Sequence, residues 1–193
     1  MLMLIAGLVI FLGVHSVRVF AEGWRTQTRA RLGENAYKGL YSVASIVGFL
    51  LIIWGYGAAR LDPTVLWASP TWTRHLAALL TLPAFVLLVA AYVPGNGIKA
   101  RAHHPMILGV KTWALAHLLA NNTLADLLLF GSFLAWAVLS FVAARRRDRV
   151  GNVVCAPGRL VPTLITVTVG LVAWAGFAMW AHTAWIGVRP FGS

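Results

Sequence analysis

Long apolar runs, each ended by charge, Pro, Gly or Asn, dominate the pattern of hydrophobic and polar positions along this chain. A helix needs about 20 mostly apolar residues to cross the hydrocarbon core of a bilayer. Six runs come close to that length, and they cover residues 2–20, 39–59, 75–93, 105–121, 124–144 and 160–186. The pattern therefore predicts an all-α fold, a polytopic integral membrane bundle of about six transmembrane helices, with residues 1–193 as a single domain.

Lys and Arg residues are distributed unequally between the segments that join these runs. The segments after the first, third and fifth runs carry twelve, namely Arg18, Arg25, Arg29, Arg31, Lys38, Lys99, Arg101, Arg145, Arg146, Arg147, Arg149 and Arg159. The segments at the opposite ends of the runs carry Arg60, Arg74 and Arg189. Cytoplasmic loops of membrane proteins are enriched in Lys and Arg. We therefore expect the twelve to face the cytoplasm and both termini to lie on the outer side.

Composition agrees with this picture and excludes several classes of protein. Hydrophobic residues make up 60% of the chain and charged residues only 11%, which does not suit a soluble domain. A net charge of +11 would suggest nucleic acid in a soluble protein. Here the basic residues lie between apolar runs and indicate topology, so we expect a lipid bilayer and no nucleic acid as partner. The single cysteine, Cys155, excludes an internal disulfide and a zinc site built from several thiolates.

The five acidic residues all lie outside the middle of the predicted spans. They are Glu22, Glu34, Asp62, Asp126 and Asp148. A mechanism with paired carboxylates inside the membrane is therefore excluded, and a proton-coupled transporter is disfavoured.

Four of the six histidines lie at the ends of the runs. His75 and His182 fall at the outer ends of the third and sixth runs, where a polar side chain costs little, and we interpret them as interfacial residues. His103 and His104 lie at the inner entrance of the fourth run, and His104 precedes Pro105, which suits a first helical turn. A helix cap or a loop contact is the simpler interpretation of this pair.

His15 and His117 differ, because they lie inside apolar runs with no acidic residue near them in sequence. Each is either a neutral core histidine with one hydrogen bond or a metal ligand. Two histidines without carboxylate or thiolate fit haem, because the haem ring itself supplies the other four ligands of the iron. Trp113 shares a helical face with His117 and joins the candidate cofactor-binding residues.

Two cations are candidate partners for the propionates of such a haem. Arg18 lies one turn from His15 on the same helical face, and Lys111 lies inside the fourth run. The alternative for Arg18 is a plain positive-inside anchor, and the alternative for Lys111 is snorkelling toward the headgroups.

The depths of the histidines leave the second ligand open. His117 lies about 20 Å beyond the inner start of its run and His15 about 8 Å from the inner end of its own, at 1.5 Å per residue. A haem between them would have to lie across the helices, unless the fourth run starts lower. His104 is the depth-matched alternative partner for His15.

Three stretches carry a family resemblance: "FLGVHS" (11–16), "LGENAYKGLYS" (32–42) and "HHPMILGVKTWALAHLLANN" (103–122). They resemble the NnrU family of bacterial membrane proteins, which is associated with denitrification and nitric oxide metabolism. That family is similar to the plant and cyanobacterial cis-zeta-carotene isomerases, which are membrane haem b enzymes. The resemblance runs over about residues 5–145. It implies a multi-pass protein of the bacterial inner (cytoplasmic) membrane that holds haem b through the motif histidines His15 and His117.

Two positions depart from the isomerase pattern. His103 stands where Arg is usual before the His-Pro pair, and no histidine lies near Trp136, where the isomerases carry one in the fifth span. The second departure weakens the expectation of isomerase chemistry more than that of haem binding.

Three functions stay open from the sequence. The first is a haem-binding protein of nitrogen-oxide metabolism, whose iron binds nitric oxide or acts on an apolar polyene as a redox-gated cis-trans isomerase, so whether it is an enzyme stays open. The second is an S-adenosylmethionine-dependent membrane methyltransferase, because His104-Pro105-x-x-x-Gly109 resembles a cofactor motif of that class, although the later acidic segment is missing. The third is a non-enzymatic carrier or assembly factor for a denitrification enzyme.

Overall fold

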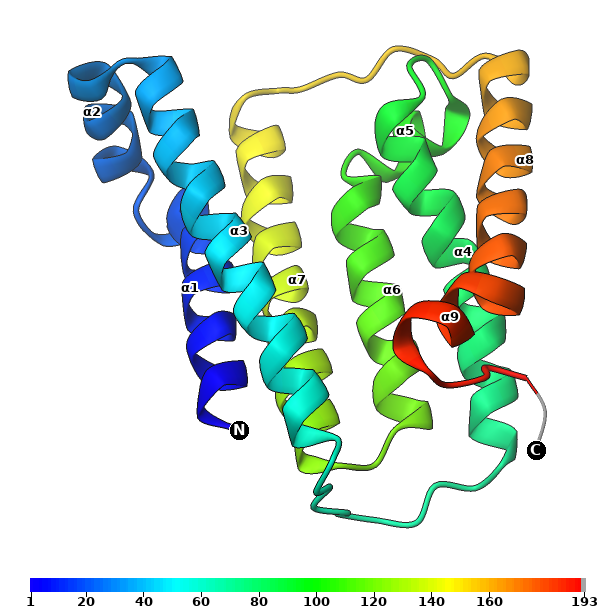
Figure 1. Cartoon of the computed structure of the whole chain (residues 1–193). Coiled ribbons are helices and arrows are strands. Elements are labelled where there is room, and N and C mark those ends of the chain that lie inside the picture. Colours follow the sequence, from blue (N-terminus) through cyan, green and yellow to red (C-terminus); the bar gives the residue numbers. More distant parts are fainter. Residues whose placement is uncertain (192–193) are drawn as a thin grey trace.

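The computed structural model describes residues 1–191, which form helices joined by short connections (Figure 1). Six helices follow the six apolar runs: α1 (Leu2–Phe20), α3 (Glu34–Ala59), α4 (Trp72–Tyr92), α6 (Pro105–Ala120), α7 (Leu124–Val150) and α8 (Leu160–Gly176). The last run continues through a π-helical turn, η1 (Phe177–Ala181), into α9 (His182–Ile186). Two further helices, α2 (Glu22–Leu32) and α5 (Gly97–Ala102), lie between the runs.

The predicted all-α membrane bundle is confirmed. Five helical segments are long and apolar enough to cross a membrane, and α6, with 16 residues, is a shorter apolar helix. The chain is thus a multi-pass membrane protein. α3 starts at Glu34 rather than at residue 39. An ion pair of 2.7 Å between the Lys38 ammonium and the Glu34 carboxylate stabilises this first turn. α7 continues past residue 144 to Val150, because long basic side chains remain helical while their charges reach the headgroups.

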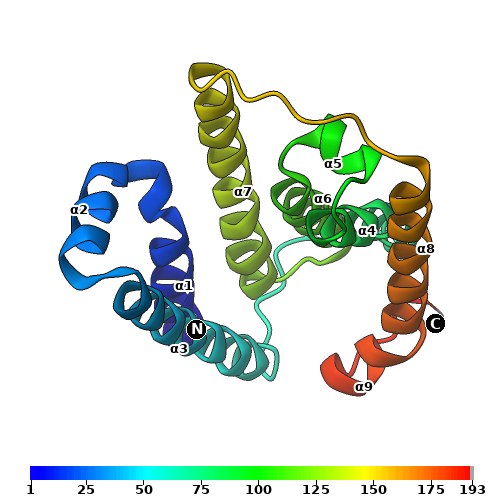
Figure 2. The same cartoon turned by 90° about the horizontal axis from the view of Figure 1, so that it is seen from above.

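The helices pack in the spatial order α3, α1, α7, α6, α4, α8. Seen from above, this row curves so that α3 and α9 end near one another on the open side (Figure 2). There Arg60, which follows α3, donates a hydrogen bond of 2.8 Å from Nη1 to the carbonyl oxygen of Ile186 at the end of α9. The bond joins the two ends of the curved row.

Small residues set the spacing between neighbouring helices. A Cβ atom on Gly7 of α1 would lie 2.6 Å from the backbone nitrogen of Ile52 on α3, and one on Gly170 of α8 would lie 2.7 Å from Cα of Val86 on α4. In lipid no hydrophobic force drives helices together, so close backbone approach through glycine supplies the packing energy instead.

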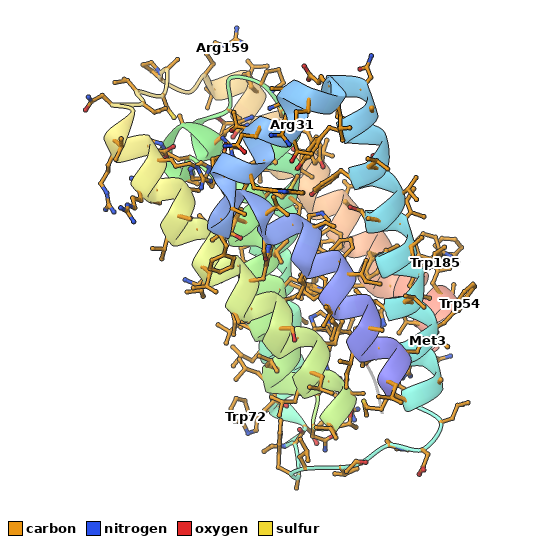
Figure 3. The ribbon with its side chains drawn as sticks, turned by 90° about the vertical axis from the view of Figure 1, so that its left-hand side faces the viewer. Met3, Arg31, Trp54, Trp72, Arg159 and Trp185 are labelled. Atoms are coloured by element: carbon orange, nitrogen blue, oxygen red, sulfur yellow. The ribbon has the colours of Figure 1, made fainter. Side chains whose placement is uncertain are left out.

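The basic segments and the N-terminus lie at opposite ends of the bundle. Arg31 and Arg159 lie at one end and Trp72 at the other (Figure 3). The N-terminus lies at the same end as the connections after α3 and α6 (Figure 1). This arrangement agrees with the predicted topology, and which end faces the cytoplasm stays a prediction.

Candidate functional site

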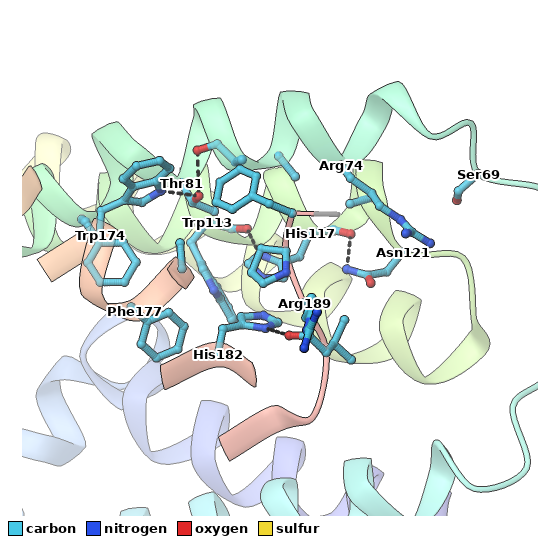
Figure 4. Close-up of a pocket in the computed structure, with 18 of the residues that line it drawn as sticks. Ser69, Arg74, Thr81, Trp113, His117, Asn121, Trp174, Phe177, His182 and Arg189 are labelled. Atoms are coloured by element: carbon cyan, nitrogen blue, oxygen red, sulfur yellow. Dashed lines mark hydrogen bonds between the residues drawn. The ribbon is translucent and has the colours of Figure 1, made fainter. Parts of the chain in front are cut away.

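A cavity of about 460 Å³ lies between α4, α6 and the segment from α8 to Phe191 (Figure 4). We call it the outer cavity, because its lining includes Arg74, Asn121, Asn122 and His182 at the end of the bundle that the sequence predicts to face outward. Its apolar and aromatic wall includes Phe85, Leu88, Val110, Trp113, Trp174 and Phe177. Its polar lining includes Ser69, Arg74, Thr81, His117, Asn121, Asn122, His182 and Arg189.

His117 enters the outer cavity from the last turn of α6. Its Nδ1 lies 2.9 Å from the carbonyl oxygen of Trp113, which can only accept, so Nδ1 carries the proton. The neutral ring then presents the Nε2 lone pair, and no residue among 1–191 hydrogen-bonds to that atom. Phe130 of α7 stacks on the imidazole with ring centroids 4.6 Å apart. The ring is therefore fixed in orientation with a free ligand atom.

His182 enters the same cavity from the first residue of α9. Its Nδ1 lies 2.7 Å from the carbonyl oxygen of Val188, so its Nε2 is also the acceptor atom of the neutral ring. The ring of Phe177 meets it edge-on at 5.8 Å. The rings of His117 and His182 both line this cavity (Figure 4).

A π-helical turn directly precedes His182. The backbone N–H of His182 bonds to the carbonyl of Phe177, five residues earlier, instead of to the residue four earlier. One extra residue in a turn rotates everything that follows around the helix axis, and such turns are frequent at functional sites. The turn thus decides which side of the bundle His182 faces.

Polar groups line the outer mouth of the cavity. Asn121 donates from Nδ2 to the carbonyl of His117 at 2.9 Å, which holds the end of α6. Arg74 and Arg189 bring two guanidinium groups to the lining. The hydroxyl of Ser69 is buried and has no hydrogen-bond partner among the described residues.

His15 lies in a different environment from His117. Its ring stacks on Phe11 at 4.2 Å, lies 5.2 Å from the ring of Tyr41, and does not line the outer cavity. A row of aromatic rings lies between the two histidines. The ring centroids are 5.8 Å apart for Phe11 and Phe133, 5.7 Å for Phe133 and Trp113, and 5.1 Å for Trp113 and His117. His15 and His117 therefore do not line one cavity, and their shared ligation of iron stays a prediction.

Two of the predicted site residues line the outer cavity, and the two predicted propionate partners do not. Trp113 and His117 belong to the lining, whereas Arg18 and Lys111 are outside it. Arg18 is exposed, with its Nε 3.8 Å from the Glu22 carboxylate. Lys111 is half-buried on α6.

His104 lies at the basic end of the bundle, bound to an acid that is distant in sequence. Its Nε2 lies 2.9 Å from the carboxylate of Asp148 on α7, which also accepts from Arg145 at 3.3 Å. His103 Nδ1 is 3.3 Å from the same carboxylate. Among residues 1–191, no three His, Cys, Asp or Glu side chains are arranged to hold a metal ion. The contacts of His103 and His104 with Asp148 join the start of α6 to α7, in agreement with the interpretation of this pair as a loop contact.

Sequence reasoning missed His182, Arg74 and Arg189 as members of one site. Two signals were present in the sequence. "ALAH" (114–117) and "MWAH" (179–182) are alike, and each ends in a histidine that enters the cavity. Arginine is uncommon in loops on the predicted outer side, because Lys and Arg are enriched in cytoplasmic loops. An arginine there is therefore a candidate for a specific contact or a ligand.

A protein-family model described as NnrU protein matches residues 3–190, nearly the whole chain. Comparison with curated proteins and with solved structures gave no significant match. This chain, with its outer cavity and its motif histidines, belongs to the NnrU family.

Proposed function

We propose that this chain is a haem b-binding protein of the bacterial inner membrane, with His117 as an iron ligand. The observation that carries the proposal is the Nε2 atom of His117, which faces a cavity of about 460 Å³ while Nδ1 is held by a backbone carbonyl. Metal-binding histidines commonly have their second nitrogen fixed in this way.

The chemistry of the outer cavity fits a haem. An apolar wall with a few convergent polar groups is typical of cofactor sites. Phe85, Trp113 and Phe177 supply apolar surface for a flat macrocycle, and two arginines supply donors for carboxylates. The buried Ser69 hydroxyl, which lacks a partner among residues 1–191, is a further donor for a ligand.

Bound haem supplies an iron centre whose use depends on its axial ligands and on access to them. The chain's own residues would hold the centre, exclude water and orient the ligand ring. Phe130 and the Trp113 carbonyl fix the imidazole of His117 from two sides. Membership in the NnrU family supports a place in denitrification or nitric oxide metabolism. In this proposal nitric oxide is a ligand of the centre, and isomerisation of an apolar polyene is the related enzymatic alternative.

The methyltransferase alternative receives no support from the geometry. His104 is engaged by Asp148, and a Cβ on Gly109 would lie 3.0 Å from the carbonyl oxygen of Ala84 on α4. The motif residues thus serve packing and an inter-helix contact rather than an open site.

The test is an absorption spectrum of the protein purified from haem-replete cells, oxidised and then reduced. We expect a Soret band in the wild type, and we expect His117→Ala to lose most of the bound haem because it removes an iron ligand. His75→Ala is the matched control, since His75 is exposed at the same end of the bundle and outside the cavity lining. Colourless wild-type protein would overturn the proposal. Copurification of such protein with a reductase subunit would favour an assembly role.

A further inference from the structure

We infer that His182 is the iron ligand opposite His117, and that Arg74 and Arg189 bind the haem propionates. The inference rests on the proposed function and assigns residues that neither motif nor family similarity marks. It makes the outer cavity, rather than the space between His15 and His117, the site of the haem.

The first argument is that His117 and His182 share one cavity and one hydrogen-bonding arrangement. In each ring the Nδ1–H donates to a backbone carbonyl, at 2.9 Å and 2.7 Å, which leaves Nε2 as the ligand atom. His15 has the same kind of bond to Phe11, but its ring stacks against that phenyl group and is not part of the cavity lining.

The second argument is depth in the membrane. His117 lies three residues before the end of α6, and His182 lies in the last helical turns of its span, so both are at the outer end of the bundle. His15 lies five residues before the end of α1 at Phe20, which is at the basic end. At 1.5 Å rise per residue, axial ligands of one iron have to come from similar depths unless the haem lies across the helices.

The third argument is the π-helical turn from Phe177 to Ala181. Such turns are uncommon in helices and recur where a functional side chain has to be redirected. Here the turn ends at His182 and aims its ring at the cavity that His117 lines.

The fourth argument is the contacts that the three arginines at this end of the bundle make. Arg60 donates to the Ile186 carbonyl and so fixes α9, while Arg74 and Arg189 line the cavity. Neither of the latter forms an ion pair with an acidic side chain of residues 1–191. Two guanidinium groups at the mouth of an apolar cavity match a flat apolar ligand that carries two carboxylates.

The test compares single histidine variants of the full-length protein in detergent, by haem content, optical spectrum and electron paramagnetic resonance. We expect low-spin haem with two imidazole ligands in the wild type. His182→Ala should give high-spin haem that external imidazole returns to low spin, because imidazole can occupy the vacated space. His15→Ala should keep the wild-type spectrum. The reverse result, with His15→Ala high-spin and His182→Ala unchanged, would overturn the inference while leaving haem binding in place.

Three further variants keep the test decisive if His182→Ala folds poorly. His182→Met retains a possible axial ligand and should stay low-spin with a raised midpoint potential, because thioether ligation favours the reduced iron. Arg189→Gln should weaken haem affinity about tenfold through the loss of a charge-assisted hydrogen bond, and Arg74→Gln likewise. Arg18→Gln is the matched control and should leave affinity unchanged. An unchanged potential in His182→Met, or lost affinity in Arg18→Gln alone, contradicts the assignment.

Discussion

At the scale of single residues, the buried carboxylate of Asp126 is held by three hydrogen bonds. Asp126 is 5% exposed and accepts hydrogen bonds from the Thr123 hydroxyl at 2.6 Å, from the Thr123 backbone N–H at 3.0 Å and from the Tyr56 hydroxyl at 2.5 Å. These bonds cap α7 and join it to α3. Because Phe130, one turn further along α7, stacks on His117, the cap also positions the ring that packs against this imidazole.

Removing the hydroxyl of Tyr56 tests this network. Tyr56→Phe should lower the free energy of unfolding by about 1.5–3 kcal/mol, because the buried Asp126 carboxylate loses a donor. The measurement is the thermal unfolding midpoint in detergent. Tyr37→Phe is the control, since the hydroxyl of Tyr37 has no hydrogen-bond partner among the described residues. Equal midpoints for the two variants would show that the bond contributes nothing.

At the scale of helices, the position of α8 against α4 shapes the outer cavity. Gly170 permits the approach, because a Cβ there would lie 2.7 Å from Cα of Val86. Trp174 follows one turn later, and its Nε1 donates to the Thr81 hydroxyl on α4 at 3.1 Å. The same helix then carries Phe177 and His182 to the cavity.

A single methyl group on α8 should therefore disturb the site. We expect Gly170→Ala to destabilise the protein by about 1–3 kcal/mol, as overpacking does, and to reduce haem retention because α8 must move outward. Gly176→Ala adds the same group on the same helix where nothing lies within 4 Å, so it should be neutral. Thermal unfolding and haem content measure both effects. A neutral Gly170→Ala would refute the packing argument.

At the scale of the whole molecule, charge is separated between two ends. The twelve Lys and Arg residues counted in the sequence lie at the end of α1, in α2, in the first turns of α3, in α5, in the last turns of α7 and directly before α8. The opposite end carries three arginines: Arg74 and Arg189 line the outer cavity, and Arg60 donates to the carbonyl of Ile186 at the end of α9. The few arginines at this end of the bundle thus lie either in the cavity lining or against the end of α9.

Cysteine labelling tests the orientation. Cys155 lies in the connection between α7 and α8 at the basic end. In intact cells a membrane-impermeant maleimide should not react with Cys155, and permeabilised cells should be labelled. The double variant Cys155→Ala, Asp62→Cys moves the thiol to the exposed connection after α3 and should be labelled in intact cells. The opposite labelling pattern would invert the topology.

The sequence was sufficient to locate the six apolar helices, but not to find α2 and α5 or the full extent of α3 and α7. In lipid every backbone polar group must be satisfied within the segment, so a long apolar run can only be a helix. The first and fourth runs match α1 and α6 to within one residue. Arg18 marks the last turn of α1, and His104-Pro105 marks the start of α6. The family motifs likewise depend on residues that are close in sequence, such as Trp113 and His117.

Only the tertiary structure decided which histidines share a site. His117 and His182 are 65 positions apart, and their meeting depends on the curved order of the helices and on one π-helical turn. The hydropathy pattern predicts neither the order of the helices nor the π-helical turn. Helix pairing in lipid depends on where small residues permit backbone contact. The sequence by itself determined a six-helix membrane protein with imidazoles inside it. The packing determined that a cavity with two imidazoles and two guanidinium groups lies at its outer end.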